Sequence, residues 1–243
     1  MDCVSGMSIY PDKSIDMILC DLPYGVTGCR WDSLIPFDKL WEQYLRIIKD
    51  NGAIVLTACQ PFTTALINSQ PKYFKYVWYW KKNMVTAFAN AKKQPLRCVE
   101  DICVFYKQQP TYNPQGIIVL DKPIKRRGKC IPKHGDSVYK VDTLSKSTET
   151  YITHYPRNVL EIKCERGLHP TQKPVELFEY LIRTYTNENE IVFDGCMGSG
   201  TTAIACMKSN RQFTGFEFDK SHYETAIKRI NDYKLTHYND IHC

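Results

Sequence analysis

Two short segments of the sequence place chemically useful side chains directly after a predicted strand. The first follows the mostly apolar run 15–20 and reads Asp21-Leu22-Pro23-Tyr24. Its carboxylate and a backbone carbonyl at Leu22 or Pro23 can accept hydrogen bonds from an exocyclic amine, which favours a pyramidal nitrogen with an available lone pair. The Tyr24 ring can stack on the same flat group. The segment is therefore suited to a reaction at the amino group of a nucleobase-like ring, without a covalent intermediate.

The second segment is a glycine-rich turn after the run 191–194, which ends in Asp194. Gly198 and Gly200 carry no Cβ, so backbone N–H groups can approach a ligand closely where Thr201-Thr202 opens a helix. Glu217, at the tip of the next predicted strand, can accept both hydroxyls of a ribose. Asp194 repels phosphates and suits an ammonium group. The turn therefore favours S-adenosylmethionine over a dinucleotide.

The elements that must position these segments alternate between strand and helix, as in a doubly wound, mostly parallel α/β sheet. Because ligands of such sheets bind at the carboxyl ends of the strands, we expect both segments to lie at one edge. Strands are predicted at 15–20, 53–57, 77–80, 102–106, 191–194 and 213–217. Helices are predicted at 37–48, ended by Asn51-Gly52, and at 60–69, 178–185, 201–209 and 223–230.

The chain length and charge predict one core with a basic insertion. A chain of 243 residues suits a single α/β domain with an appendage. Between residues 107 and 166 there are twelve basic and six acidic side chains, so the whole formal net charge of +6 lies there. A polyanion is the natural partner of such a surface, and a solvated basic loop is the alternative. We expect two halves of one domain, 1–106 and 167–243, around the insertion 107–166.

Other classes of protein are disfavoured by composition. The eleven cysteines are scattered without CxxC spacing, so we expect reduced, buried thiols and no metal site. No apolar run approaches the roughly 20 residues that cross a bilayer, and the start lacks a basic segment followed by an apolar one. We therefore expect a cytoplasmic protein.

The order of the motifs resembles that of the β group of amino-directed DNA methyltransferases, over nearly the whole chain. In that group a (D/S/N)PP(Y/F) motif precedes a target-recognition region and the cofactor motif comes last. The segments that carry the resemblance are Asp21-Leu22-Pro23-Tyr24, Val99-Glu100-Asp101-Ile102, His169-Pro170-Thr171-Gln172-Lys173-Pro174, Gly198-Ser199-Gly200-Thr201-Thr202 and Asp2-Cys3.

The resemblance implies a Rossmann-like methyltransferase fold with S-adenosylmethionine as cofactor and double-stranded DNA as substrate. It makes 1–106 the catalytic half, 107–166 the target-recognition insertion and 167–243 the cofactor-binding half. The implied catalytic residues are Asp21, Leu22, Pro23 and Tyr24. The expected cofactor-binding residues are Asp2, Cys3, Asp21, Thr171, Lys173, Asp194, Gly198, Gly200, Thr201, Thr202 and Glu217.

The implied acceptor is an exocyclic amine of a base that has left the duplex. The initial Asp with Tyr in the first motif favours adenine N6, while cytosine N4 and an RNA amine are alternatives. Methylation of a protein glutamine and a non-catalytic binder of DNA and cofactor are further alternatives. A homodimer is expected by analogy with the family.

Basic residues outside the motifs are predicted to contact phosphates. Two pairs follow strand ends that we expect to face the ligand cleft, and a cluster lies in the insertion. These residues are Lys81, Lys82, Lys92, Lys93, Lys125, Arg126, Arg127 and Lys129.

The sequence departs from the family pattern in three places. Leu22 replaces the first proline of the catalytic motif, whose role falls to the backbone, so activity should survive. Gly195-Cys196 replaces the usual Pro-Phe and removes a ring beside the cofactor, which predicts weaker cofactor binding. Asp2 follows Met1 directly, so either the sheet lacks an edge strand that the family usually has or the chain is shortened.

Overall fold

The computed structural model describes residues 2–25, 28, 32–126, 148–165, 167 and 172–238. The chain forms two compact units. The first unit comprises Met1–Asn113 and Arg157–Cys243, and the second comprises Pro114–Pro156. The second unit is narrower than the predicted insertion 107–166, because residues on both flanks pack with the first unit.

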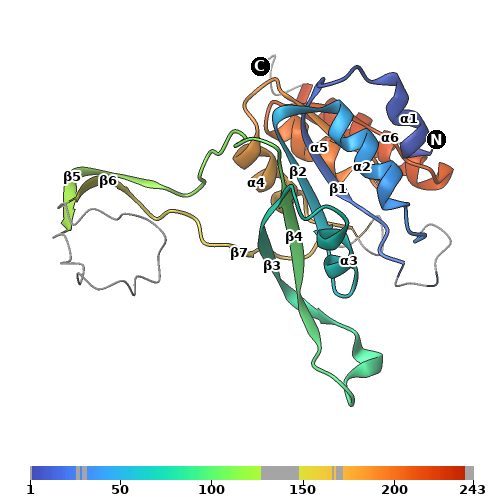
Figure 1. The fold of residues 1–243 in the computed structure, drawn as a ribbon, viewed down its shortest axis with the longest axis horizontal. Coiled ribbons are helices and arrows are strands. Elements are labelled where there is room, and N and C mark those ends of the chain that lie inside the picture. Colours follow the sequence, from blue (N-terminus) through green and yellow to red (C-terminus); the bar gives the residue numbers. More distant parts are fainter. Residues whose placement is uncertain are drawn as a thin grey trace. The chain divides into compact units, whose positions relative to one another are not determined.

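A seven-stranded sheet in the order β7-β3-β4-β2-β1-β8-β9 forms the centre of the first unit (Figure 1). Four neighbouring pairs are parallel, and β4 runs antiparallel to both β2 and β3. The predicted doubly wound, mostly parallel α/β sheet is confirmed. The strands of the first unit are β1 (Ile15–Asp21), β2 (Ile48–Ala58), β3 (Phe74–Thr86), β4 (Arg97–Phe105), β7 (Val159–Glu161), β8 (Ile191–Asp194) and β9 (Gln212–Gly215).

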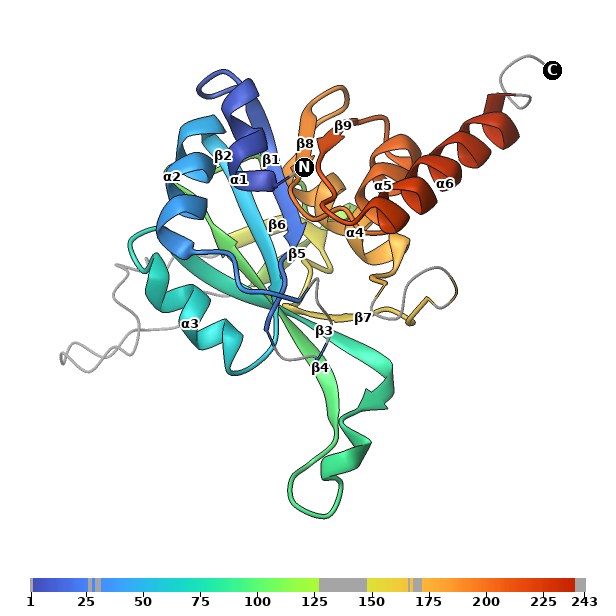
Figure 2. The same ribbon diagram turned by 90° about the vertical axis from the view of Figure 1, so that its right-hand side faces the viewer.

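Helices cover both faces of this sheet. Successive residues of a strand point to opposite faces, and the buried strands carry apolar side chains on both. On β1, Leu19 packs against α4 and α5, whereas Ile18 packs against α2 and α3. Figure 2 shows the two layers of helices on either side of the strands. The helices are α1 (Cys3–Gly6), α2 (Phe37–Ile47), α3 (Phe62–Ser69), α4 (Val175–Tyr185), α5 (Thr201–Lys208) and α6 (Lys220–Tyr238), with 3₁₀ turns η1 (Met7–Ile9) and η2 (Phe88–Asn90).

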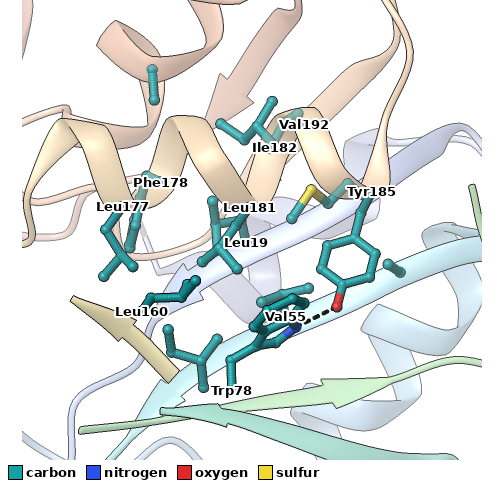
Figure 3. Packing of buried hydrophobic residues seen from close by; sticks show 14 of the residues in the cluster. Leu19, Val55, Trp78, Leu160, Leu177, Phe178, Leu181, Ile182, Tyr185 and Val192 are labelled. Carbon is teal, nitrogen blue, oxygen red and sulfur yellow. Dashed lines mark hydrogen bonds between the residues drawn. The ribbon is translucent and has the colours of Figure 1, made fainter. Parts of the chain in front are cut away.

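Helix α4 is fixed on the sheet by apolar packing and one buried polar contact. Leu181 and Tyr185 lie over Leu19 and Trp78, as Figure 3 shows. The indole Nε1 of Trp78 donates a hydrogen bond of 2.6 Å to the Tyr185 hydroxyl. This packing fixes α4 on the sheet, and α4 begins directly after Lys173-Pro174.

Several predicted element boundaries differ from the structure, and two of the differences have a clear physical cause. Helix α2 ends at Ile47, and Asn51-Gly52 lies within β2 instead of ending a helix. The register between β1 and β2 shifts there, and a Cβ on Gly52 would lie 2.7 Å from the carbonyl oxygen of Asp16. The glycine therefore serves close strand pairing at a bulge. Strand β3 is also much longer than the predicted 77–80, since it forms one side of a hairpin with β4.

The second unit contains an antiparallel pair, β5 (Ile118–Arg126) and β6 (Thr148–Thr153), which lies within the predicted basic insertion. Lys125 stands opposite Glu149 in the backbone register. Across the described residues of both units, no helix is long and apolar enough to cross a membrane, and no cluster of metal-binding side chains is found.

Candidate active site

A pocket of about 310 Å³ joins the two segments that the sequence singled out. Asp21 ends β1 and Asp194 ends β8, and the two parallel strands are paired through Ile18 and Phe193. Asp21 therefore lies two residues beyond the level of Asp194, on the adjacent strand. The pocket is lined by Asp21, Leu22 and Pro23 on one side and by Asp194, Gly198, Thr201, Thr202 and Glu217 on the other.

The Asp21 carboxylate is held by three side chains. The Tyr24 hydroxyl donates to Oδ1 over 2.8 Å, and the Thr57 hydroxyl donates to the same oxygen. Lys173 Nζ donates to Oδ2 over 2.7 Å. A carboxylate offers about four acceptor positions. Within the part of the chain that the structure describes, Oδ2 thus keeps a position for a further donor from the pocket.

The Asp21 carboxylate belongs to a row of four charged side chains in which carboxylate and ammonium groups alternate. Lys173 Nζ is 3.4 Å from Glu100 Oε2, and Lys82 Nζ donates to Glu100 Oε1 over 2.8 Å. Burial alone lowers the pKa of Lys173, but Asp21 and Glu100 outweigh it and raise this pKa to about 12. Two ammonium groups and two carboxylates therefore balance each other, which is the arrangement that buried charges require.

Tyr24 is anchored as a neutral phenol. Burial, together with the charges of Asp21 and Glu100, raises its pKa well above the ordinary value. Its ring stacks on Phe62 with the ring centres 5.1 Å apart, and Lys173 Nζ lies 5.6 Å from the Tyr24 ring centre. Phe62 and Lys173 therefore both occupy space around the Tyr24 ring.

Asp194 has a different environment. Its carboxylate accepts hydrogen bonds from the Thr202 hydroxyl and from the backbone N–H of Cys196, the latter over 2.9 Å. Among the described residues no cation forms an ion pair with it. Burial raises the pKa of Asp194 to about 6, against the opposing effect of these hydrogen bonds. The site thus holds a carboxylate whose charge is poorly compensated.

The glycine turn adopts backbone conformations that favour glycine. Gly198 has φ 51° and Gly200 has φ 79°, both in the left-handed region. The Gly198 N–H donates to Glu217 Oε2 over 2.8 Å. This hydrogen bond connects the glycine turn to the segment that follows β9. A Cβ on Gly200 would approach Ala226 of α6 to 3.2 Å. Helix α6 therefore packs closely against the turn.

Most of the predicted cofactor-binding residues line the pocket, including Asp2 and Cys3. Asp2 also caps α1, because its side chain accepts from the Ser5 N–H over 2.9 Å. Lys173 also lines the pocket, and its ammonium group donates a hydrogen bond to Asp21. Thr171 lies outside the described residues.

The predicted phosphate-contacting residues have unlike environments. Lys82 is 7% exposed and paired with Glu100, so it is no surface cation. Successive residues of β3 alternate between the two faces of the sheet, so Lys82 lies on the same face as the buried Trp78 and Trp80. Lys81 is exposed and paired with Glu161 over 3.0 Å, whereas Lys92 and Lys93 are exposed. Lys125 is exposed in β5, the side chain of Arg126 is not described, and Arg127 and Lys129 lie outside the described residues.

Sequence reasoning missed several residues of the site. Thr57 holds Asp21, and its place at the carboxyl end of the neighbouring strand β2 is a signal that could have found it. Phe218 follows Glu217, lines the pocket and is 78% exposed. Gln172 lines the pocket, and its buried Oε1 has no hydrogen-bond donor among the described residues. No local sequence pattern indicated Glu100 as a partner of Lys173.

A family model described as DNA methylase, for N6- and N4-directed enzymes, matches residues 15–228. The chain belongs to this family. It is an amino-directed DNA methyltransferase with a Rossmann-like fold. The DNA adenine methyltransferase YhdJ of Escherichia coli K12 is 26% identical over 257 residues, which cover 95% of this chain and 81% of that protein.

Solved structures share the fold. The complex of M1.HpyAVI with S-adenosylmethionine superposes with a TM-score of 0.64 at 23% identity, over 94% of this chain and 96% of that chain. The cytosine-N4-specific PvuII DNA methyltransferase gives a TM-score of 0.67 at 15% identity, over 98% and 91%. The fold is thus shared with a cytosine-N4-specific enzyme, so the fold alone does not identify the amine.

Proposed function

We propose that this DNA methylase transfers a methyl group from S-adenosylmethionine to the exocyclic N6 of an adenine that has been flipped out of double-stranded DNA. The observation that carries the proposal is the single pocket lined both by Asp21-Leu22-Pro23 and by the glycine turn. One motif suits an amine and the other suits an adenosine-like cofactor. Their meeting in one pocket of about 310 Å³ suits a direct transfer between two ligands.

The pocket residues fit S-adenosylmethionine. Asp194 supplies a carboxylate with no paired cation among the described residues, which suits the ammonium group. Gln172 Oε1, which has no donor within the same described part of the chain, can accept a hydrogen bond elsewhere in this pocket. Glu217 suits the ribose hydroxyls, and the exposed Phe218 ring offers an apolar surface for the adenine. When bound, the cofactor supplies an electrophilic methyl group.

In this proposal Asp21 orients the amine of the target base. Tyr24 and Thr57 occupy Oδ1, so the amine donates to the remaining position on Oδ2, and a carbonyl of Leu22 or Pro23 accepts its second hydrogen. Lys173 prevents the carboxylate from turning. The nitrogen would gain the methyl group as the methyl–sulfur bond of the cofactor breaks, and it would afterwards lose one of its two protons to solvent. The fixed Asp21 carboxylate stabilises the positive charge on the nitrogen between these events without reorganising.

The choice of adenine rests on the Asp-Leu-Pro-Tyr motif and on the similarity to the adenine-specific YhdJ. The PvuII enzyme acts on cytosine N4, and its likeness to this chain concerns the fold alone. Cytosine N4 is therefore the alternative that the experiment must separate.

DNA recognition is assigned to the region 107–166, with the two-stranded unit at its centre. Lys125 is exposed on β5, next to Arg126, and its neighbours in the sequence include Arg127 and Lys129. Such a cluster is suited to phosphates. Residues 1–106 and 167–243 then form the catalytic and cofactor-binding halves of one domain.

The test is single-molecule sequencing of genomic DNA from cells that express the chain, beside cells that express Asp21→Ala. We expect N6-methyladenine in one short sequence context, and only with the unaltered chain. N4-methylcytosine in its place would contradict the adenine assignment. If neither mark appears although the protein binds the cofactor, the DNA substrate itself is wrong.

A further inference from the structure

The β3–β4 hairpin extends beyond the edge of the sheet that carries Asp21. The strand pairings place Asp21 level with Thr57, and Thr57 level with Ile102 of β4. Strand β4 begins five residues earlier, at Arg97, on the side toward which β1 ends. At about 3.3 Å per residue, the hairpin reaches about 17 Å past the level of Asp21 before its tip begins. Figure 2 shows β3 and β4 running together beyond the other strands to η2.

This reach matches the dimensions of a DNA duplex. Duplex DNA rises about 3.4 Å per base pair, so 17 Å corresponds to about five base pairs. In a duplex that delivers a base to Asp21 and whose axis runs along the hairpin, the base pairs about five steps from the target lie at this distance. We name residues 83–98 the arm.

The charged side chains of the arm are all positive. Residues 83–98 contain three basic side chains and no acidic one. Lys92 and Lys93 are exposed and, within the described parts of the chain, pair with no carboxylate. Arg97 donates to the Cys59 thiol over 3.8 Å. Lys81 and Lys82, just before the arm, are in contrast neutralised by Glu161 and Glu100.

The tip of the arm presents an aromatic ring to solvent. Phe88 is 67% exposed at the start of η2. Backbone hydrogen bonds from Asn90 to Ala87 and from Lys93 to Asn90 fold the tip into a closed turn. A short hairpin turn that carries one exposed ring and two lysines resembles the apolar wedges flanked by cations with which proteins enter a DNA groove.

We propose that the arm is a second DNA-binding element, separate from the unit 114–156, in which Lys92 and Lys93 bind phosphates about five base pairs from the target and Phe88 enters the groove between them. The proposal rests on the proposed function, since it takes duplex DNA as the ligand. It assigns the arm to holding the duplex and gives it no part in the reaction.

The experiment measures binding to a labelled 30-base-pair duplex of random sequence by fluorescence anisotropy at several salt concentrations. In Lys92→Ala/Lys93→Ala we expect the slope of log K against log salt to fall by about 1.8, because two phosphate contacts are lost. Lys72→Ala/Lys75→Ala is the matched control. It removes two exposed lysines at the opposite end of β3 and should leave the slope unchanged.

Phe88→Ala tests the tip separately. We expect about a tenfold loss of affinity at fixed salt with an unchanged slope, because the ring contributes stacking or wedging and no charge. Ile9→Ala is the control, since Ile9 is equally exposed but lies in η1, outside the arm. A change of molar mass by light scattering in Phe88→Ala would overturn the proposal, because the tip would then hold a second copy of the chain.

Methyl transfer to DNA by the unaltered protein is measured in parallel with a radiolabelled donor. Transfer with an unchanged salt slope in Lys92→Ala/Lys93→Ala overturns the arm alone and leaves the proposed function intact. Absence of transfer to DNA overturns the proposed function, and the arm proposal with it.

Discussion

Asp21 and Asp194 end two adjacent parallel strands, yet the fold gives them opposite electrostatic environments. Asp21 is paired with the ammonium of Lys173, and two hydroxyls complete its contacts. Asp194 is buried with hydrogen-bond donors only, and burial raises its pKa to about 6. In the proposed function, Asp21, which has its own cation, accepts a hydrogen bond from the neutral amine, and Asp194, which has none among the described residues, binds the ammonium group of the cofactor.

The comparison also explains why a cation suits only one of the two positions. The charge of Asp194 has a desolvation cost that a bound ammonium group would offset. Asp21 already has its cation, so a second one would meet Lys173.

Asp21→Asn should have the largest effect on catalysis. We expect kcat to fall by about 10²- to 10³-fold, because a fixed charge opposite the developing positive nitrogen is removed. The measurement is single-turnover methyl transfer at saturating cofactor. Asp101→Asn is a control on β4, where the carboxylate accepts from Thr63 and does not line the pocket. A kcat within threefold of the unaltered enzyme would contradict the role of Asp21.

Lys173→Met should lower both stability and kcat, since it leaves two buried carboxylates without their shared cation. Removal of one partner of a buried pair costs about 3–5 kcal/mol. The free energy of unfolding is measured by urea denaturation, and kcat is measured on the folded fraction. Lys173→Arg keeps the charge and should recover most of the stability. Equal losses in both variants would mean that packing, and not charge, is what Lys173 contributes.

Asp194→Asn should stabilise the protein while it weakens cofactor binding. The pKa of Asp194 is about 6 in the folded state against the ordinary 3.8, which corresponds to about 3 kcal/mol of destabilisation of the fold at pH 8. In the Asn variant, a poorer hydrogen bond from Cys196 or Thr202 reduces the gain by about 1–2 kcal/mol. We therefore expect a gain of about 1–2 kcal/mol in the free energy of unfolding. Calorimetry should show a weaker Kd for S-adenosylmethionine. Unchanged binding would remove Asp194 from the cofactor site.

The same residue predicts a pH dependence of cofactor binding. Because its pKa is raised, Asp194 stabilises the fold below pH 3.8 and loses this contribution as the pH rises through about 6. Binding of a cation depends on the charged form of Asp194 and therefore changes with pH in the opposite direction. Its affinity should fall by up to about tenfold for each pH unit below pH 6. Calorimetry between pH 5 and 8 measures this change, and Asp194→Asn should show a flat profile. The same slope in both proteins would assign the titration to another group.

Cys196→Phe should have the smallest effect. It restores the ring that the family has beside the cofactor, so affinity should improve by about 2- to 10-fold, as for one aromatic contact. Cys98→Phe, on β4 and outside the pocket lining, is the control for added bulk. An unchanged affinity measured by calorimetry would show that the family's ring has no equivalent position in this pocket.

The order of elements and the positions of the two motifs could be predicted from the sequence, because both depend on local patterns. An apolar run followed by Asp21 or Asp194 is a short-range signal, and parallel strands bring their carboxyl ends to one edge. Where the predictions failed, a long-range contact decided the outcome. Gly52 ends no helix because β1 pairs beside it, and β3 is longer than its apolar run because β4 pairs along it.

The sequence by itself determined the family pattern, the α/β alternation and the two strand-end carboxylates. Only the tertiary structure decided what surrounds each carboxylate. Lys173 meets Asp21 across 152 residues of sequence, and Lys82 is buried against Glu100 while Lys92 stays in solvent. A lysine has the same local signal in both settings. Its burial depends on which side of the strand is covered and on a carboxylate from another strand, and both are decided only when the sheet has formed.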